Sequence, residues 1–125
     1  MISTRINETA KLVIHIAAGE LSAEKIKTAF EARLENPDYR PGMKVLWDCS
    51  RATLSSISAD EVWDLAELNT RRANIRGLGK SAIVVSKDVD FGVGRMFEFY
   101  ACGLPWQTAV FRDLESAMHW LDDPL

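Results

Sequence analysis

The polar residues best placed to do chemistry follow an apolar run in the first half of the chain. Asp48 comes at the end of this run, and Ser50, Ser55, Ser56 and Ser58 follow it. In α/β proteins, residues just beyond the carboxyl ends of strands often bind ligands. We therefore expect Asp48 to lie at a functional position, with hydrogen bonding to the following loop as its simpler role.

Two of the serines are candidate phosphosites because they stand at the predicted start of a helix. Ser58 and Glu61 match the S-x-x-E capping box. A phosphate on Ser56 or Ser58 would meet free backbone N–H groups and the positive end of the helix dipole. The commoner role of a serine in this position is a helix N-cap, which alone would explain Ser58.

A second candidate site is the glycine pair Gly92 and Gly94, followed by Arg95. Each glycine inside a helix costs about 1 kcal/mol relative to alanine, and the cost is tolerated where another group must approach closely. The pair does not belong to a GxGxxG motif, because Phe97 stands where the third glycine would be. We expect close packing of this helix on the sheet or on a second subunit. Arg95 would bind an anion near the strand ends or pair with Glu98.

Several apolar residues fall outside the helix faces that we expect to be buried. Leu68 and Ile75 lie on a different side of their helix from the buried stripe, Phe91 is similarly placed on the next helix, and Trp63 is at the edge of the inner face. A contiguous exposed set would mark an interface or a lipid-facing groove, whereas scattered exposure is normal. We predict a homodimer formed through these two helices.

Metal and nucleophile motifs are weak in this sequence. His15 and His119 have no partner four residues away, and Cys49 and Cys102 form no CxxC motif. We expect both cysteines to be small buried residues, with a Cys–His pair as the alternative. The sequence therefore predicts no metal site, no cofactor and no catalysis.

The composition is that of a soluble globular protein. The 125 residues suit one domain covering the whole chain, 1–125, and 47% are hydrophobic. The net charge of −3 does not indicate the positively charged surface that nucleic-acid binding requires. No apolar run approaches the roughly 18 residues of a transmembrane segment, and the N-terminus lacks an apolar signal core. We expect a cytoplasmic protein.

Strands and helices alternate along most of the chain, and these elements must position the candidate residues. The order is β-β-α-β-α-β-α-β-α, which predicts an α/β fold: a mostly parallel five-stranded sheet with an antiparallel edge strand, covered by helices. Strands are predicted at residues 2–6, 11–17, 43–48, 80–86 and 106–111. Helices are predicted at residues 22–35 and 58–76, from an N-cap at Asp88 to a stop at Gly103, with Val89 on the inner face, and from an N-cap at Asp113 through Leu121.

Three stretches of the chain resemble the SpoIIAA-like branch of the STAS domains. They are residues 41–48, residues 91–98, and residues 110–113 together with Ala117, Trp120 and Leu121. The sequence is most similar to small, stand-alone bacterial proteins with this fold and no established function. The resemblance covers essentially the whole chain. It implies a non-enzymatic protein-interaction or regulatory domain with an unidentified protein partner.

The resemblance also limits what can be expected of the serines. In phosphorylatable STAS domains, an Asp-Ser pair follows the strand that ends in aspartate. Asp48 matches that aspartate, but residues 54–58 lack the Asp-Ser-x-Gly pattern. We therefore interpret residues 49–57 as a recognition loop.

An alternative function also follows from the resemblance, because some proteins of this kind are associated with CRAL-TRIO-like lipid binding. That association implies a carrier or sensor of a small lipophilic or anionic ligand, held between the helices and the strand ends near Arg95. A large apolar pocket lined by Phe91, Phe97 and Phe99 would favour this alternative.

Overall fold

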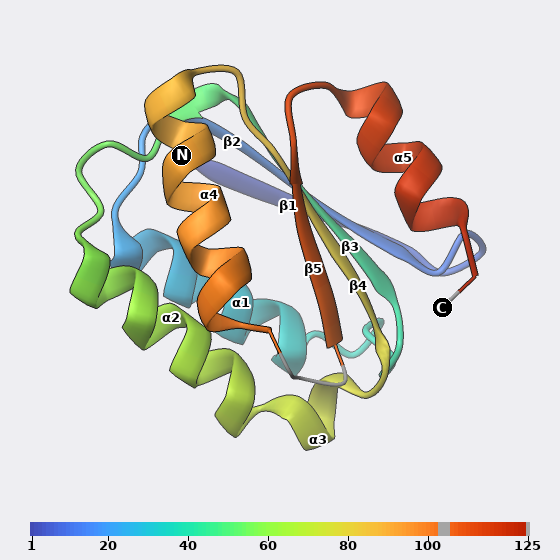
Figure 1. Cartoon of the computed structure of the whole chain (residues 1–125). Coiled ribbons are helices and arrows are strands. Elements are labelled where there is room, and N and C mark those ends of the chain that lie inside the picture. Colours follow the sequence, from blue (N-terminus) through green and yellow to red (C-terminus); the bar gives the residue numbers. More distant parts are fainter. Residues whose placement is uncertain (103–105, 125) are drawn as a thin grey trace.

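A five-stranded mixed sheet forms the centre of the structure, a computed structural model that describes residues 1–102 and 106–124 (Figure 1). The strand order is β1-β2-β3-β4-β5, and only β1 and β2 pair in antiparallel fashion. The predicted sheet, with its antiparallel edge strand, is confirmed. The strands are β1 (Ile2–Asn7), β2 (Leu12–Glu20), β3 (Lys44–Thr53), β4 (Gly79–Val84) and β5 (Trp106–Phe111).

Helices cover both faces of this sheet (Figure 1). Helices α1, α2 and α4 lie on one face, where side chains such as Cys49, Val62 and Val110 form the larger core cluster. Helix α5 covers the other face through Ala117 and Leu121. The helices are α1 (Ala23–Glu35), α2 (Ala59–Arg71), α3 (Ala73–Arg76), α4 (Asp88–Tyr100) and α5 (Leu114–Asp122).

Local sequence signals set several of the helix boundaries. Ser58 accepts a hydrogen bond from the Glu61 amide at 3.2 Å, and the Glu61 carboxylate accepts one from the Ser58 amide at 2.9 Å, so the capping box is complete. Ser22 and Asp113 cap α1 and α5, where their side chains accept hydrogen bonds from the Lys25 and Ser116 amides. Asn36, which precedes a proline, ends α1.

Two predicted boundaries between Asp48 and Arg76 are wrong. Strand β3 does not end at Asp48 but continues to Thr53, because β2 runs alongside it as far as Glu20. The predicted helix 58–76 is two helices, since the chain turns at Arg72 and α3 then carries Arg76 into the interior. Only residues 54–58 remain as a loop where we expected one at 49–57.

The start of α4 also differs from the prediction. Asp88 does not cap the helix but is its first residue, and its carboxylate pairs with Arg112 at 2.7 Å. Asp90, rather than Val89, faces the core: Asp90 is fully buried, whereas Val89 is exposed. The predicted stop at Gly103 lies outside the described residues.

No helix in the described ranges is long and apolar enough to cross a bilayer.

The two glycines of α4 have different surroundings. A Cβ atom added to Gly94 would lie 2.6 Å from Val110 Cγ2 and 3.2 Å from Val110 Cβ, so the missing side chain lets α4 approach β5. A Cβ atom added to Gly92 would meet nothing within 4 Å. Close packing of the helix on the sheet therefore explains Gly94 but not Gly92.

This difference predicts opposite effects for two matched substitutions. Gly94→Ala should lower the free energy of unfolding by about 1–3 kcal/mol, because the β-branched Val110 side chain cannot move away cheaply. Gly92→Ala should raise it by roughly 0.5–1 kcal/mol through helix propensity alone. Urea denaturation of both variants measures the difference, and stabilisation by Gly94→Ala would contradict the close approach.

Candidate functional site

The polar residues predicted at the end of β3 serve mainly local structure. Asp48 Oδ1 accepts hydrogen bonds from the Ser50 amide at 3.2 Å and the Ser50 hydroxyl at 2.6 Å. The Ser56 hydroxyl donates to the Leu21 carbonyl at 3.0 Å, and Ser55 accepts from Thr53 at 3.1 Å. These contacts fix the loop before α2, and the phosphorylation of Ser56 or Ser58 stays a prediction.

The predicted surface around Gly92 and Arg95 is polar and exposed. Gly92 is exposed, and Arg95 pairs with Glu98 at 3.8 Å. Glu98 also accepts a hydrogen bond from the Val110 amide at 3.0 Å. Arg95 thus has the pairing role that we considered, and its carboxylate partner would compete with an anionic ligand.

Of the apolar residues that fall outside the helix faces expected to be buried, only some are exposed. The expected exposure of Leu68 is wrong, because α1 also packs on α2 and covers that side of the helix. Trp63 and Ile75 are exposed, and Phe91 is half-buried beneath the Arg112 guanidinium group. Cys102 is also exposed, so the expectation that both cysteines are buried holds only for Cys49.

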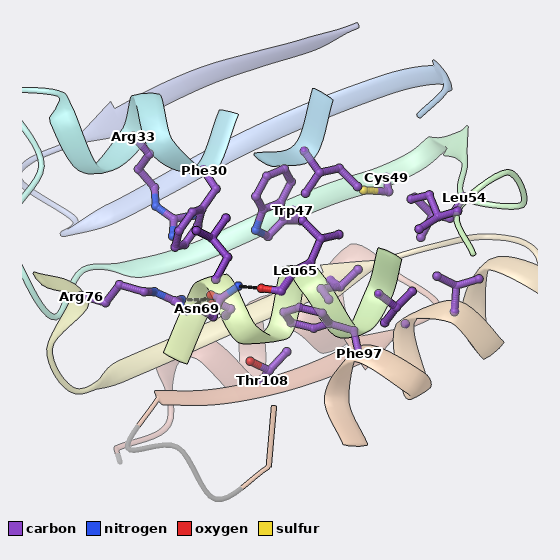
Figure 2. Close-up of a pocket in the computed structure, with 18 residues that line it drawn as sticks. Phe30, Arg33, Trp47, Cys49, Leu54, Leu65, Asn69, Arg76, Phe97 and Thr108 are labelled. Carbon is purple, nitrogen blue, oxygen red and sulfur yellow. Dashed lines mark hydrogen bonds between the residues drawn. The ribbon is translucent and has the colours of Figure 1, made fainter. Parts of the chain in front are cut away.

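A largely apolar cavity of about 90 Å³ lies between the sheet and helices α1, α2 and α4 (Figure 2). Trp47, Leu65 and Ile83 are among its apolar walls. Phe97 also lines the cavity, but Phe91 and Phe99 do not. Of the other residues that we predicted as a ligand or partner surface, only Leu68 and Gly94 line it.

Two buried arginines give this cavity one polar end (Figure 2). In Figure 2, Arg33 and Arg76 lie at one end of the cavity and Leu54 lies at the other. Only 2% of Arg33 and 3% of Arg76 is exposed. The Phe30 ring packs against both guanidinium groups, with its centroid 4.9 Å from Arg33 Cζ and 5.5 Å from Arg76 Cζ.

Arg33 has only one hydrogen-bond partner among the described residues. Its Nη1 atom donates to His15 Nε2 at 3.1 Å, while its Nε and Nη2 atoms are buried with no partner. None of the ion pairs in the described part of the chain includes this arginine. A buried cation with free donors and no carboxylate is unusual in a folded protein, because such charges are normally paired.

Arg76 is held by neutral groups. Its Nη1 atom donates to Asn69 Oδ1, and its Nη2 atom donates to Ser81 Oγ at 2.9 Å. Its guanidinium carbon lies 3.9 Å from the centroid of the Trp106 ring, a cation–π contact. The Nε atom is buried without a partner, and no ion pair includes Arg76 in the part of the chain that the structure describes.

Burial weakens both cations but does not neutralise them. Loss of water lowers the pKa of Arg33 to about 10. The same effect, followed by repulsion from Arg33, lowers the pKa of Arg76 to about 9. Both groups therefore carry a positive charge at neutral pH, which makes this end of the cavity strongly electropositive.

His15, on β2, accepts a hydrogen bond from Arg33. The histidine is fully buried on β2, and its ring stacks on Trp47 with a centroid distance of 3.9 Å. Burial, followed by repulsion from Arg33, lowers the pKa of His15 to about 3, so the ring is neutral. Nε2 can then accept from Arg33 while the Nδ1 proton is donated to Thr4 Oγ1 at 2.8 Å.

The side chains around the cavity are poorly suited to covalent chemistry. The Cys49 thiol lines the cavity, but burial raises its pKa to about 12, so it stays protonated. Asp90 is buried and accepts a hydrogen bond from the Leu54 amide at 2.8 Å. No group of three metal-ligating side chains gathers within residues 1–102 and 106–124. The arrangement can bind and orient a molecule, with charge at one end and apolar contact elsewhere.

Two solved structures are similar to almost the whole chain. An uncharacterised DUF3478-family protein with a SpoIIAA-like fold, from Shewanella loihica PV-4, has a TM-score of 0.59 and 18% identity, over 97% of this chain and 92% of that chain. The anti-sigma factor antagonist SpoIIAA in its unphosphorylated form has a TM-score of 0.55 and 13% identity, over 95% and 94%. The chain has a SpoIIAA-like fold. At these identities the similarity establishes the fold alone. No family model and no curated protein matches the sequence.

The sequence of this SpoIIAA-like chain does not predict the arginine pair, although it contains one signal of it. Arg33 stands between Phe30 and Leu34 on the stripe that faces the core, where a charged residue is out of place. Arg76 had a simpler explanation as a positive charge at a helix C-terminus. Nothing in the local pattern around His15 indicates that it meets Arg33.

The neutral state of His15 predicts an acid-sensitive stability. Its pKa is lower in the folded state than in the unfolded chain, so its contribution is complete above about pH 6.5 and declines as the pH falls toward 3. The slope should approach about 1.4 kcal/mol per pH unit for this one proton. Urea denaturation from pH 7.5 to 4.5 measures it.

His15→Gln should flatten that pH dependence, because the amide oxygen can still accept from Arg33 but does not titrate in this range. His119→Gln is the matched control: His119 is exposed on α5, and its replacement should leave the slope unchanged. An unchanged slope in His15→Gln would show that other groups cause the acid sensitivity.

Proposed function

We propose that this SpoIIAA-like chain is a non-enzymatic binding domain that carries or senses a small lipophilic or anionic ligand. The observation that supports the proposal is the cavity beneath α1, α2 and α4, which combines apolar walls with one cationic end. Small-molecule sites are mostly apolar pockets with a few polar groups that fix orientation. On this proposal, the ligand lies between the sheet and helices α1, α2 and α4, rather than at Asp48 and the loop before α2.

The absence of a reaction is part of the proposal. Catalysis would need an activated nucleophile or a general base near the bound molecule. The Cys49 thiol at the cavity is held protonated, and His15, which contacts Arg33 but does not line the cavity, has its Nε2 atom occupied by Arg33. A carrier or sensor needs neither group to react.

A second candidate function is self-association through α2 and α4, as expected for an interaction or regulatory domain. An exposed aromatic row supports it: Trp63 on α2 meets Tyr100 on α4 edge-on at 5.4 Å, and Tyr100 meets Phe99 at 5.9 Å. The exposed fractions of Trp63 and Phe99 are 49% and 72%. A second copy of this chain would cover the row with its own equivalent surface, as in a symmetric dimer.

The ligand-binding proposal predicts stabilisation by small amphipathic molecules. Thermal unfolding should shift upward with at least one member of a panel of hexanol, benzyl alcohol, hexanoate and benzoate, because a ligand that binds only the folded state stabilises it. The gain is about 2.7 kcal/mol at a hundredfold excess over Kd.

Filling the cavity provides the control for that experiment. Leu65→Trp should abolish the shift, since the larger ring would occupy the space next to Leu65. Leu114→Trp introduces the same ring at an exposed position on α5 and should keep the shift. If no member of the panel stabilises the natural protein, the ligand-binding proposal is wrong.

The dimer proposal predicts that one charge on the aromatic row separates the subunits. Light scattering should give the mass of a dimer at high micromolar concentration, and Phe99→Lys should give that of a monomer. Leu114→Lys, on the opposite side of the sheet, should leave the dimer intact. A natural protein that is monomeric across this range would refute self-association.

A further inference from the structure

The unpaired arginine groups indicate which chemical class of ligand the cavity takes. We propose that Arg33 and Arg76 form a carboxylate-binding site, and that the ligand is a short monocarboxylic acid whose apolar part fills the cavity. This inference rests on the proposed ligand-binding function and makes it more specific. It places the charged end of the ligand beside Phe30 and the apolar end toward Leu54.

The geometry of Arg33 supports a carboxylate in particular. The Nε and Nη2 atoms form one edge of the planar guanidinium group, and both are buried without a partner. This edge matches the two oxygens of a carboxylate, which arginine commonly binds with two parallel hydrogen bonds. The remaining donor, Nη1, is held by His15, which fixes the orientation of the group.

Arg76 adds a second cation that also packs against the Phe30 ring, with its Cζ atom 5.5 Å from the ring centroid. Its Nε atom is also buried and unpaired, and its other donors hold Asn69 and Ser81. The Tyr39 ring also packs near Arg33, with its centroid 5.8 Å from Arg33 Cζ, and its buried hydroxyl interacts with Arg76. Two buried positive charges without a carboxylate are costly, and an incoming anion would offset that cost.

The size and lining of the cavity limit the rest of the ligand. An apolar cavity of about 150 Å³ can hold benzene. The 90 Å³ here is smaller but partly open, so a six-carbon chain or ring would fill it and extend beyond it. The walls formed by Trp47, Ile83 and Phe97 offer apolar contact rather than hydrogen bonds. A fully hydrated inorganic anion would leave these walls without a partner, which favours an acid with an apolar group.

Isothermal titration calorimetry with matched ligands tests the inference. Hexanoate and benzoate should bind at least tenfold more tightly than hexanol and benzyl alcohol, and sodium sulfate and sodium chloride should show no comparable binding. Equal binding of the alcohols would overturn the carboxylate site while leaving the ligand-binding function intact. Equal binding of the inorganic anions would overturn the assignment to an amphipathic acid. If neither the acids nor the alcohols bind, the proposed function itself fails.

Substitutions of the arginines assign the binding to these residues. Arg33→Met and Arg76→Met should each weaken hexanoate binding by about tenfold to a hundredfold, the usual effect of losing charged hydrogen bonds. Arg33→Lys keeps the charge but not the planar fork, so it should also weaken binding. Arg72→Met removes an arginine that pairs with Glu31 at the surface and should leave the affinity unchanged.

Two readouts keep this test independent of folding. Circular dichroism and thermal unfolding without ligand establish that each variant is folded, and binding of hexanol should persist in Arg33→Met and Arg76→Met. Hexanoate labelled with ¹³C at its carboxyl carbon should titrate at a lower pH when it is bound than when it is free, because the arginines favour its ionised form. A bound hexanoate with an unchanged titration would overturn the assignment.

Discussion

The hydrogen bond between Arg33 and His15 ties the helix layer to the sheet. It joins α1 to β2 in a place that water does not reach, and His15 passes the connection to β1 through Thr4 and to β3 through its stacking on Trp47. A buried arginine can be kept only if its surroundings accept its protons and tolerate its charge. This requirement explains the neutral histidine, the aromatic rings and the polar Asn69 and Ser81 side chains on this face.

The fold could be predicted because its signals are local and agree with one another. The capping box at Ser58, the N-caps at Ser22 and Asp113 and the break after Asn36 each act within four residues. The apolar runs between them could form only buried strands. The extension of β3 to Thr53 could not be predicted, because residues 49–53 are mixed in polarity and become a strand only where β2 continues beside them.

The sequence points to a different place from the arginine-lined cavity for a physical reason. Asp48 and the serines are candidates because they are polar groups at a predicted strand end and helix start. In the structure, nearby backbone and hydroxyl groups already form hydrogen bonds with most of them. Arg33 and His15 are 18 residues apart, and each looks ordinary alone. Their chemistry exists only because α1 crosses back over β2, which is a tertiary contact and not a sequence pattern.

The position of the cavity also bears on the speed with which it could exchange its contents. Helices α2 and α4 form its outer wall, and the Trp63–Tyr100 contact joins them on the outside. The cavity is partly open, so the residence time of a molecule bound there would depend on how far these helices separate as well as on its affinity. The edge-on aromatic pair would hold the two helices together, and a partner seated on the same two helices would slow both entry and release.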